Sequence, residues 1–260
     1  MNPLPRAAVL ALWAGPVLSG RANAGALLRA VQGDDERHEV ATADASQLEP
    51  LALPGRLGEL LAGLRDQHVR ALRLVLPVPG DPSALPGPAS VNEAAIEAGE
   101  CLVTVGGPPI ALIPEVYEFG SVYEVGHQVI WQVVDCSPPV APLTTTVGEA
   151  ERELREALLR ATDALHDLDL ARWRPDASDR IDDLRQGADV PWPSSTPPRA
   201  VRVLDLAWRV RSIVELARED DGAAVNGWEA TRRDEELRQL DDVSRRALVA
   251  AVNSPIHVPD

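Results

Sequence analysis

The pattern of apolar and polar positions divides the chain into a front half of short apolar runs and a back half of long helical stripes. The front half is organised around Val69 to Pro88, where Leu72, Leu74, Val75, Leu76 and Val78 form a nearly continuous apolar run. The run stops at Pro79-Gly80-Asp81-Pro82, and an apolar run closed by turn residues is typical of a strand buried on both faces. We expect this strand to be the heart of the front half.

Helices are expected before this strand, and further strands after it. Asn23 is a natural N-cap for the second helix, and Gly126-His127 fits a type II′ turn between the last two strands. The predicted helices cover residues 7–18 with a bend at Gly15-Pro16, then 23–32, 56–66 and 91–100; the predicted strands cover 38–42, 71–78, 101–105, 110–113, 121–125 and 128–135.

Three long amphipathic helices are predicted in the back half. Thr146 and Glu149 match a capping box that opens a helix running to about Trp173. A second helix starts at Thr196-Pro197, and a third starts at Asn226 and runs to about Val252. Apolar residues recur along them at spacings of three and four, which is typical of helices that pack in a bundle.

Together these elements predict an α+β protein. A mixed or antiparallel sheet covered by helices is expected over residues 1–142, and an antiparallel helical bundle over 146–260. The length of 260 residues allows two modules or one integrated domain.

Charge and composition narrow the possible partners. The formal charge of −15 argues against nucleic acid or an anionic membrane as the main partner, whereas a basic protein partner remains possible. All 25 basic residues are arginines, so lysine-dependent phosphate loops, Schiff bases and Ser-Lys dyads are excluded. Cys101 and Cys136 lie far apart and indicate neither a zinc site nor a disulfide framework.

The stretch Met1 to Ala24 has features of a secretory signal, with Arg6, an apolar run and Ala22-Asn23-Ala24. Pro16 interrupts that run, and Arg21 sits beside the supposed cleavage site. A cytoplasmic location is therefore the expectation, and an exported or membrane-associated protein is the alternative. The run is also shorter than the roughly 20 residues that a bilayer span needs.

Candidate metal chemistry is confined to one helical face. Asp163, His166 and Asp167 fall at i, i+3 and i+4, and a carboxylate-bridged site would need similar ligands from a facing helix. A solvated helix face is the plainer interpretation. No cofactor or metal is expected.

A candidate ligand site is the loop Pro79 to Pro88, because ligands of open α/β sheets tend to bind beyond the ends of strands. Asp81 would anchor the ligand, with Arg73 or Glu115 as partners across the sheet. A tight surface turn shaped by proline and glycine is the alternative.

The blocks RLVLPVPGDPSALPGP, EAERELREALLRATDAL and PPRAVRVL resemble a family of uncharacterised high-GC actinobacterial proteins of about this length. The resemblance implies a bacterial cytoplasmic setting and carries no activity or site residues.

The sequence contains no nucleophile elbow, dinucleotide fingerprint, zinc-protease motif or calcium loop. We therefore expect a non-enzymatic interaction or regulatory protein of unknown oligomeric state. The alternative is a small-ligand-binding protein or an atypical carboxylate-based hydrolase with its site at the Pro79–Pro88 loop.

Overall fold

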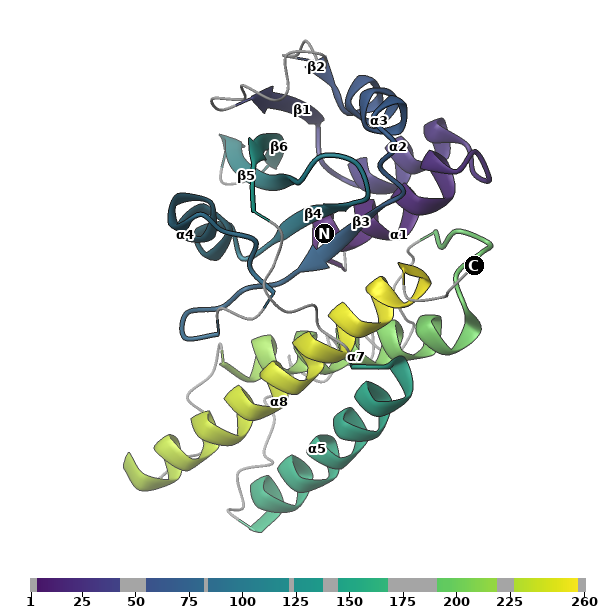
Figure 1. Ribbon diagram of the computed structural model, residues 1–260. Coiled ribbons are helices and arrows are strands. Elements are labelled where there is room, and N and C mark those ends of the chain that lie inside the picture. The colour runs from purple at the N-terminus through teal and green to yellow at the C-terminus, as the bar shows by residue number, and fades with distance from the viewer. Residues whose placement is uncertain are drawn as a thin grey trace. The chain divides into compact units, whose positions relative to one another are not determined.

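The computed structural model describes residues 4–42, 55–81, 84–121, 124–137, 145–167, 191–218 and 227–256. They form two compact units, which are drawn together in Figure 1. The first comprises Met1–Thr144, Val190–Thr196 and Pro255–Asp260; the second comprises Thr145–Asp189 and Pro197–Ser254. The first unit contains a mixed sheet covered by helices, which confirms the predicted α+β class.

Within the described residues, the first unit has a six-stranded sheet in the order β2-β1-β6-β5-β4-β3. Strands β1 and β6 run parallel, and the other neighbours are antiparallel. The strands are β1 (Arg37–Thr42), β2 (Gly55–Arg56), β3 (Ala71–Val75), β4 (Cys101–Val105), β5 (Ile110–Ser121) and β6 (Glu124–Asp135).

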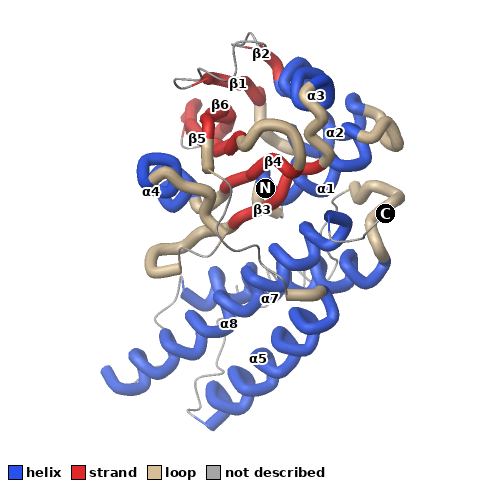
Figure 2. Tube along the Cα trace, in the orientation of Figure 1, coloured by secondary structure: helices blue, strands red, loops and turns tan. Residues whose placement is uncertain are grey.

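Helices cover both faces of this sheet, but unequally (Figure 2). Helices α1 (Arg6–Leu18), α2 (Ala24–Gln32) and α3 (Leu57–Asp66) pack together on one face. The short helix α4 (Ala89–Ala98) packs over β5 on the other face. Helix α1 continues through Pro16, and its residues 7–14 are all buried, so its apolar sequence contributes to the core of the first unit.

The strand expected at the centre of the front half is β3, and it lies at the end of the sheet order. Its apolar run is buried as predicted, since Leu74 is fully buried and Leu76 is 4% exposed. Helix α1 covers one of its faces. Hydrophobicity thus correctly indicated burial, but strand order depends on pairing partners that a local run does not reveal.

The predicted turn at Gly126-His127 is wrong. These residues lie inside β6, where Gly126 pairs with Phe119 and His127 with Glu118. A type II′ turn needs a positive φ at its first central glycine, but among the described residues of this hairpin the positive φ belongs to Gly120 and not to Gly126. Gly126 instead makes room for the Phe119 ring, whose Cζ would lie 2.7 Å from a Cβ at that position.

The predicted helix caps of Asn23 and Thr146 are confirmed. The Asn23 side chain accepts a hydrogen bond from the Gly25 N–H at 2.6 Å. Thr146 Oγ1 accepts from the Glu149 N–H at 3.2 Å, and the Glu149 carboxylate accepts from the Thr146 N–H at 2.9 Å. The N–H bond and the Thr146 hydroxyl both hold the pKa of Glu149 below its usual value.

The second unit contains the helices α5 (Val147–Asp167), α7 (Pro198–Arg218) and α8 (Gly227–Asn253), which pack pairwise. The Glu151 carboxylate of α5 forms two ion pairs, one with Arg199 of α7 at 2.7 Å and one with Arg155 of its own helix at 2.7 Å. A short 3-10 turn, η2 (Ser254–Ile256), follows α8. The expected caps and ends at Trp173 and Asn226 lie outside the described residues. No helix among the described residues is long and apolar enough to cross a bilayer.

Candidate functional site

An open groove of about 920 Å³ lies between α4 and the strands β5 and β6, and we call it the α4 groove. Helix α4 places Val91 and Ala95 against the sheet, while Ala94, Glu97 and Ala98 border the groove. Because α4 is only 10 residues long, it covers one part of a face whose strands β5 and β6 each run for 12 residues. Among the described residues of the first unit, that face is partly exposed beside the helix, where Tyr117 is 50% exposed.

Glu115 is the polar centre of the α4 groove. Its Oε2 atom accepts hydrogen bonds from the Tyr117 hydroxyl at 2.8 Å and from the Gln132 side-chain amide at 2.9 Å. The hydrogen bond to Glu115 also raises the pKa of Tyr117 above its ordinary value. These bonds hold a half-buried carboxylate in one orientation at the groove surface.

The charge of the α4 groove is negative throughout. Among the described residues, the charged ones that line it are Glu97, Glu115 and Asp135, and the described lining contains no arginine or histidine. The floor between them is apolar and includes Ile113 and Val134. Apolar surface beside fixed carboxylates favours a ligand with both a cationic group and an apolar portion.

The structure brings one of the three predicted ligand residues into this groove. Glu115 lines it, whereas Asp81 and Arg73 are not among its lining residues. Arg73 and Glu115 share the sheet face that α4 covers, but the register places their Cα atoms about 16 Å apart at the usual strand spacings. The side-chain hydrogen bonds described for Glu115 are with Tyr117 and Gln132, and not with Arg73.

The Asp81 loop has the geometry of a tight turn. The Asp81 N–H donates to the Val78 carbonyl at 3.0 Å, and Gly80 has a φ of 88°. Proline followed by glycine at the two central positions is the sequence that a type II turn requires. A ligand-binding role for Asp81 stays a prediction.

Of the proposed metal cluster, Asp163 is exposed on α5. The side chains of His166 and Asp167 lie outside the described residues, so the cluster stays a prediction. Across the side chains that the structure does describe, no group of three histidine, cysteine or acidic residues could hold a metal ion.

A buried charged network lies on the opposite side of the sheet. Asp35 accepts two hydrogen bonds from Arg6, at 2.7 and 2.6 Å. His38 Nε2 lies 3.0 Å from Asp35, and His38 Nδ1 lies 3.1 Å from Trp131 Nε1. Because an indole N–H can only donate, Nδ1 accepts and the ring proton is on Nε2, where it donates to Asp35.

This network holds the carboxylate of Asp35 ionised and the ring of His38 neutral. Burial would raise the pKa of Asp35, but hydrogen bonds from Arg6 and His38 outweigh burial and hold that pKa below its ordinary value. Burial lowers the pKa of His38, so the ring is neutral. Both ring nitrogens are already bonded, so no nitrogen remains to act as a general base. The network fastens β1 to α1 and β6.

The two thiols are not activated. Burial raises the pKa of Cys101, and it raises the pKa of Cys136 to about 11. A nucleophilic cysteine needs a lowered pKa, so neither thiol has the environment of a nucleophile.

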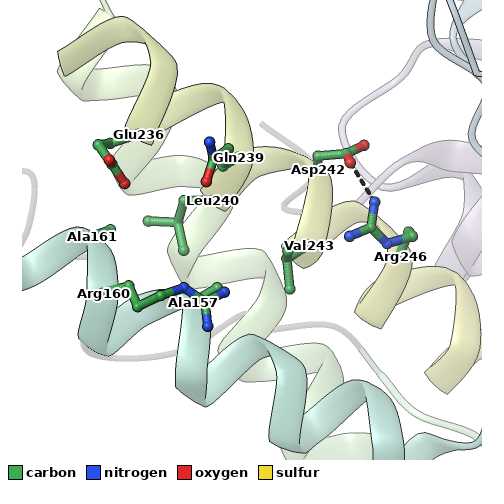
Figure 3. A pocket seen from close by; sticks show the side chains of 9 residues that line it. All are labelled: Ala157, Arg160, Ala161, Glu236, Gln239, Leu240, Asp242, Val243 and Arg246. Carbon is green, nitrogen blue, oxygen red and sulfur yellow. Dashed lines mark hydrogen bonds and ion pairs between the residues drawn. The ribbon is translucent and has the colours of Figure 1, made fainter. Parts of the chain in front are cut away.

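A second cavity of about 190 Å³ lies between α5 and α8 (Figure 3). Ala157 and Ala161 of α5 face Leu240 of α8 there. Both carboxylates that line it already have partners, since Asp242 pairs with Arg246 and Glu236 pairs with Arg232. Its volume is below the roughly 300 Å³ of the smallest typical ligand pockets. We therefore interpret it as a packing gap between helices that carry small residues.

Sequence reasoning missed Tyr117, Phe119 and Gln132. In the segment Val116-Tyr117-Glu118-Phe119 the aromatic residues recur at a spacing of two, which is typical of a strand. The predicted strand covered residues 110–113 and so ended before Pro114, whereas β5 continues through this proline to Ser121. Proline is in fact tolerated where its nitrogen faces an open sheet edge.

Similar proteins occur in mycobacteria. The chain is 29% identical over 283 residues to a protein of Mycobacterium tuberculosis (strain ATCC 25618 / H37Rv) described as "Uncharacterized protein Rv1486c", covering 95% of this chain and 96% of that protein. It is 27% identical over 290 residues to "Uncharacterized protein ML1804" of Mycobacterium leprae (strain TN), with the same coverage. No solved structure matches the chain significantly.

Two family models match consecutive parts of the chain. The Rv1486c-like protein N-terminal domain matches residues 7–145, and the Rv1486c-like protein C-terminal domain matches residues 148–249. The expected relationship to uncharacterised actinobacterial proteins is confirmed. The chain belongs to the Rv1486c-like family.

Proposed function

We propose that the chain is a non-enzymatic, cytoplasmic interaction or regulatory protein that binds a positively charged segment of a partner protein in the α4 groove. The observation that carries the proposal is the groove itself, which joins an apolar floor to the oriented carboxylate of Glu115 and whose described lining includes no basic residue. The overall charge of −15 would also attract a basic partner from a distance.

The exposed rings beside the groove support a protein ligand. Tyr117 is 50% exposed and Phe119 is 49% exposed, and both lie on the strand that borders the groove. Large side chains left exposed next to a polar rim are typical of interaction surfaces. An arginine or lysine of a partner could lie over the Tyr117 ring while it pairs with Glu115.

Peptide binding tests this proposal. The probe is a fluorescein-labelled peptide of alternating valine and arginine, and its partner probe carries glutamate in place of arginine. We expect binding of the valine–arginine peptide alone, measured by fluorescence anisotropy. Glu115→Gln and Glu97→Gln should each weaken it about threefold, because an exposed ion pair contributes up to about 1 kcal/mol. Glu153→Gln, on α5 of the other unit, removes the same charge and should have no effect.

Cross-linking locates the bound peptide. The chain contains no lysine, so carbodiimide cannot join protein carboxylates to protein lysines. A valine–lysine peptide should therefore be linked to Glu97 or Glu115, as peptide mapping by mass spectrometry would show. Linkage spread evenly over the surface carboxylates, or equal binding of the glutamate peptide, would contradict the proposal.

A small organic cation is the second candidate ligand. The volume of about 920 Å³ lies within the range of small-molecule sites, and Glu115 is already oriented by two hydrogen bonds. N-acetyl-arginine amide distinguishes the two candidates. If it binds as tightly as the peptide, the groove recognises a small ligand; if the peptide binds much more tightly, it recognises a chain segment.

A further inference from the structure

Strand β5 continues beyond its neighbour β4. Its pairs with β4 are at Leu112 and Ala111, whereas its pairs with β6 run without a break to Ser121. Pro114 has no N–H, so it cannot donate the next bond of the β4 ladder. From Pro114 onward, one edge of β5 has no neighbouring strand among the described residues.

The register shows which main-chain groups face that open edge. The Cys136 N–H donates to the Pro109 carbonyl at 3.0 Å, so Ile110 and Asp135 are a pair that exchanges no direct hydrogen bonds. Such pairs recur at every second residue, and the pairing of β5 with β6 is regular. The N–H and C=O groups of Val116 and Glu118 therefore point away from β6.

The α4 groove reaches this edge. The lining residues from β5 are consecutive, from Ile113 to Tyr117. Consecutive residues of a strand alternate between the two faces, so a groove that touches all of them borders the strand's edge as well as one face. The groove thus offers main-chain donors and acceptors beside the carboxylate of Glu115.

We infer that an extended, cationic segment of a partner protein binds by adding a strand to the edge of β5 at Val116 and Glu118. This inference rests on the proposed function and specifies how the α4 groove takes its ligand. Main-chain hydrogen bonds to β5 supply affinity, as in other cases of strand addition. Side chains on the α4 side of the added strand reach Glu97 and Glu115, which select arginine or lysine.

Charge makes a second copy of this chain a poor occupant. The same edge carries Glu118, and Glu115 and Glu97 stand beside it, so two copies paired through β5 would bring like charges together. Charged residues and proline on an open edge are also a common protection against pairing between copies. A cationic segment of another protein is attracted by these carboxylates, and it would pair at Val116 and Glu118, beyond Pro114.

Backbone methylation of the probe tests strand addition directly. Methylating the valine nitrogens of the valine–arginine peptide removes donors from one edge, and methylating the arginine nitrogens removes them from the other. We expect one methylated peptide to bind about tenfold more weakly and the other to bind nearly as well as the parent.

The protein offers a matched pair of variants. The Val116 N–H makes no bond to β6, so Val116→Pro removes a donor from the open edge without breaking the hairpin ladder. Val116→Pro should weaken peptide binding about tenfold, whereas Val116→Ala should leave it nearly unchanged. Circular dichroism confirms that each variant is folded. Hydrogen exchange of the unsubstituted protein gives a second test. The main-chain amides of Val116 and Glu118 should exchange rapidly in the free protein and slowly in the presence of the peptide.

The outcomes separate the two proposals. If the peptide binds but neither methylation nor Val116→Pro matters and the two amides stay unprotected, strand addition is overturned and groove binding stands. If neither the valine–arginine peptide nor the valine–lysine peptide binds, the proposed function fails and the inference falls with it. If sedimentation shows a dimer in which Val116 and Glu118 are protected without peptide, the occupant is a second copy and the inference is again overturned.

Discussion

Replacing Trp131 with phenylalanine tests whether the buried network fastens the sheet of the first unit. The Trp131 side chain is fully buried, and its N–H donates to His38 Nδ1 at 3.1 Å. The His38 side chain is only 6% exposed, so water would not readily replace the lost donor. An unsatisfied buried acceptor costs about 1–3 kcal/mol. The smaller ring leaves a cavity of roughly 40 Å³, which adds about 1 kcal/mol.

Trp131→Phe should therefore destabilise the first unit by about 2–4 kcal/mol. The reactivity of Cys101 measures this unit alone, because the thiol is fully buried in β4. In a Cys136→Ser background, a thiol reagent should modify Cys101 roughly 30 to 900 times faster after the substitution, provided that opening is at equilibrium. Both the background and the substitution are made in the full chain.

A double-mutant cycle with His38→Leu isolates the hydrogen bond. In the absence of His38 the buried indole N–H of Trp131 has lost its acceptor, and Trp131→Phe removes that unsatisfied donor. The substitution should then cost no more than the cavity term of about 1 kcal/mol. An equal cost of Trp131→Phe with and without His38 would refute the reasoning, since the hydrogen bond would then contribute nothing.

Three further predictions follow from local geometry. Burial keeps the pKa of His38 below its ordinary value, so the folded state binds fewer protons than the unfolded state. Urea unfolding should therefore show the free energy of unfolding decreasing as the pH falls below about 6.5, and His38→Leu should flatten that decrease. Thr146→Ala removes the cap of α5 and should lower the unfolding free energy by about 1 kcal/mol, whereas Thr146→Ser should lower it much less. Gly107→Ala places a Cβ 2.5 Å from the Gln67 carbonyl at a φ of 64°, so calorimetry should show a loss of about 1–3 kcal/mol, and a gain in melting temperature would contradict the geometry.

Features encoded by neighbouring residues were predictable. The caps of Asn23 and Thr146 depend on residues two or three positions away, so the sequence displays the whole interaction. The burial of Leu74 also follows from its own apolar run. Helix starts and buried segments were accordingly placed well.

Features that depend on distant partners were not predictable. The role of Gly126 depends on the Phe119 ring across the hairpin, and a glycine before histidine looks the same whether it forms a turn or makes room for a ring. The edge position of β3 follows from distant pairings, because β3 pairs with β4 on one side and the N-terminal strand β1 pairs with β6 instead of with β3. Of the candidate site, Glu115 was identified, but its partners Tyr117 and Gln132 come together only through the β5–β6 register.

The parallel pairing of β1 with β6 has a consequence during synthesis. His38 and Trp131 are separated by 93 positions, so the first strand emerges from the ribosome long before its neighbour. At about 5–20 residues per second, the nascent chain waits roughly 5–19 s for that neighbour. Until β6 emerges, the edge of β1 that pairs with it has no partner strand, so a chaperone that binds nascent chains has a defined interval in which to act on this protein.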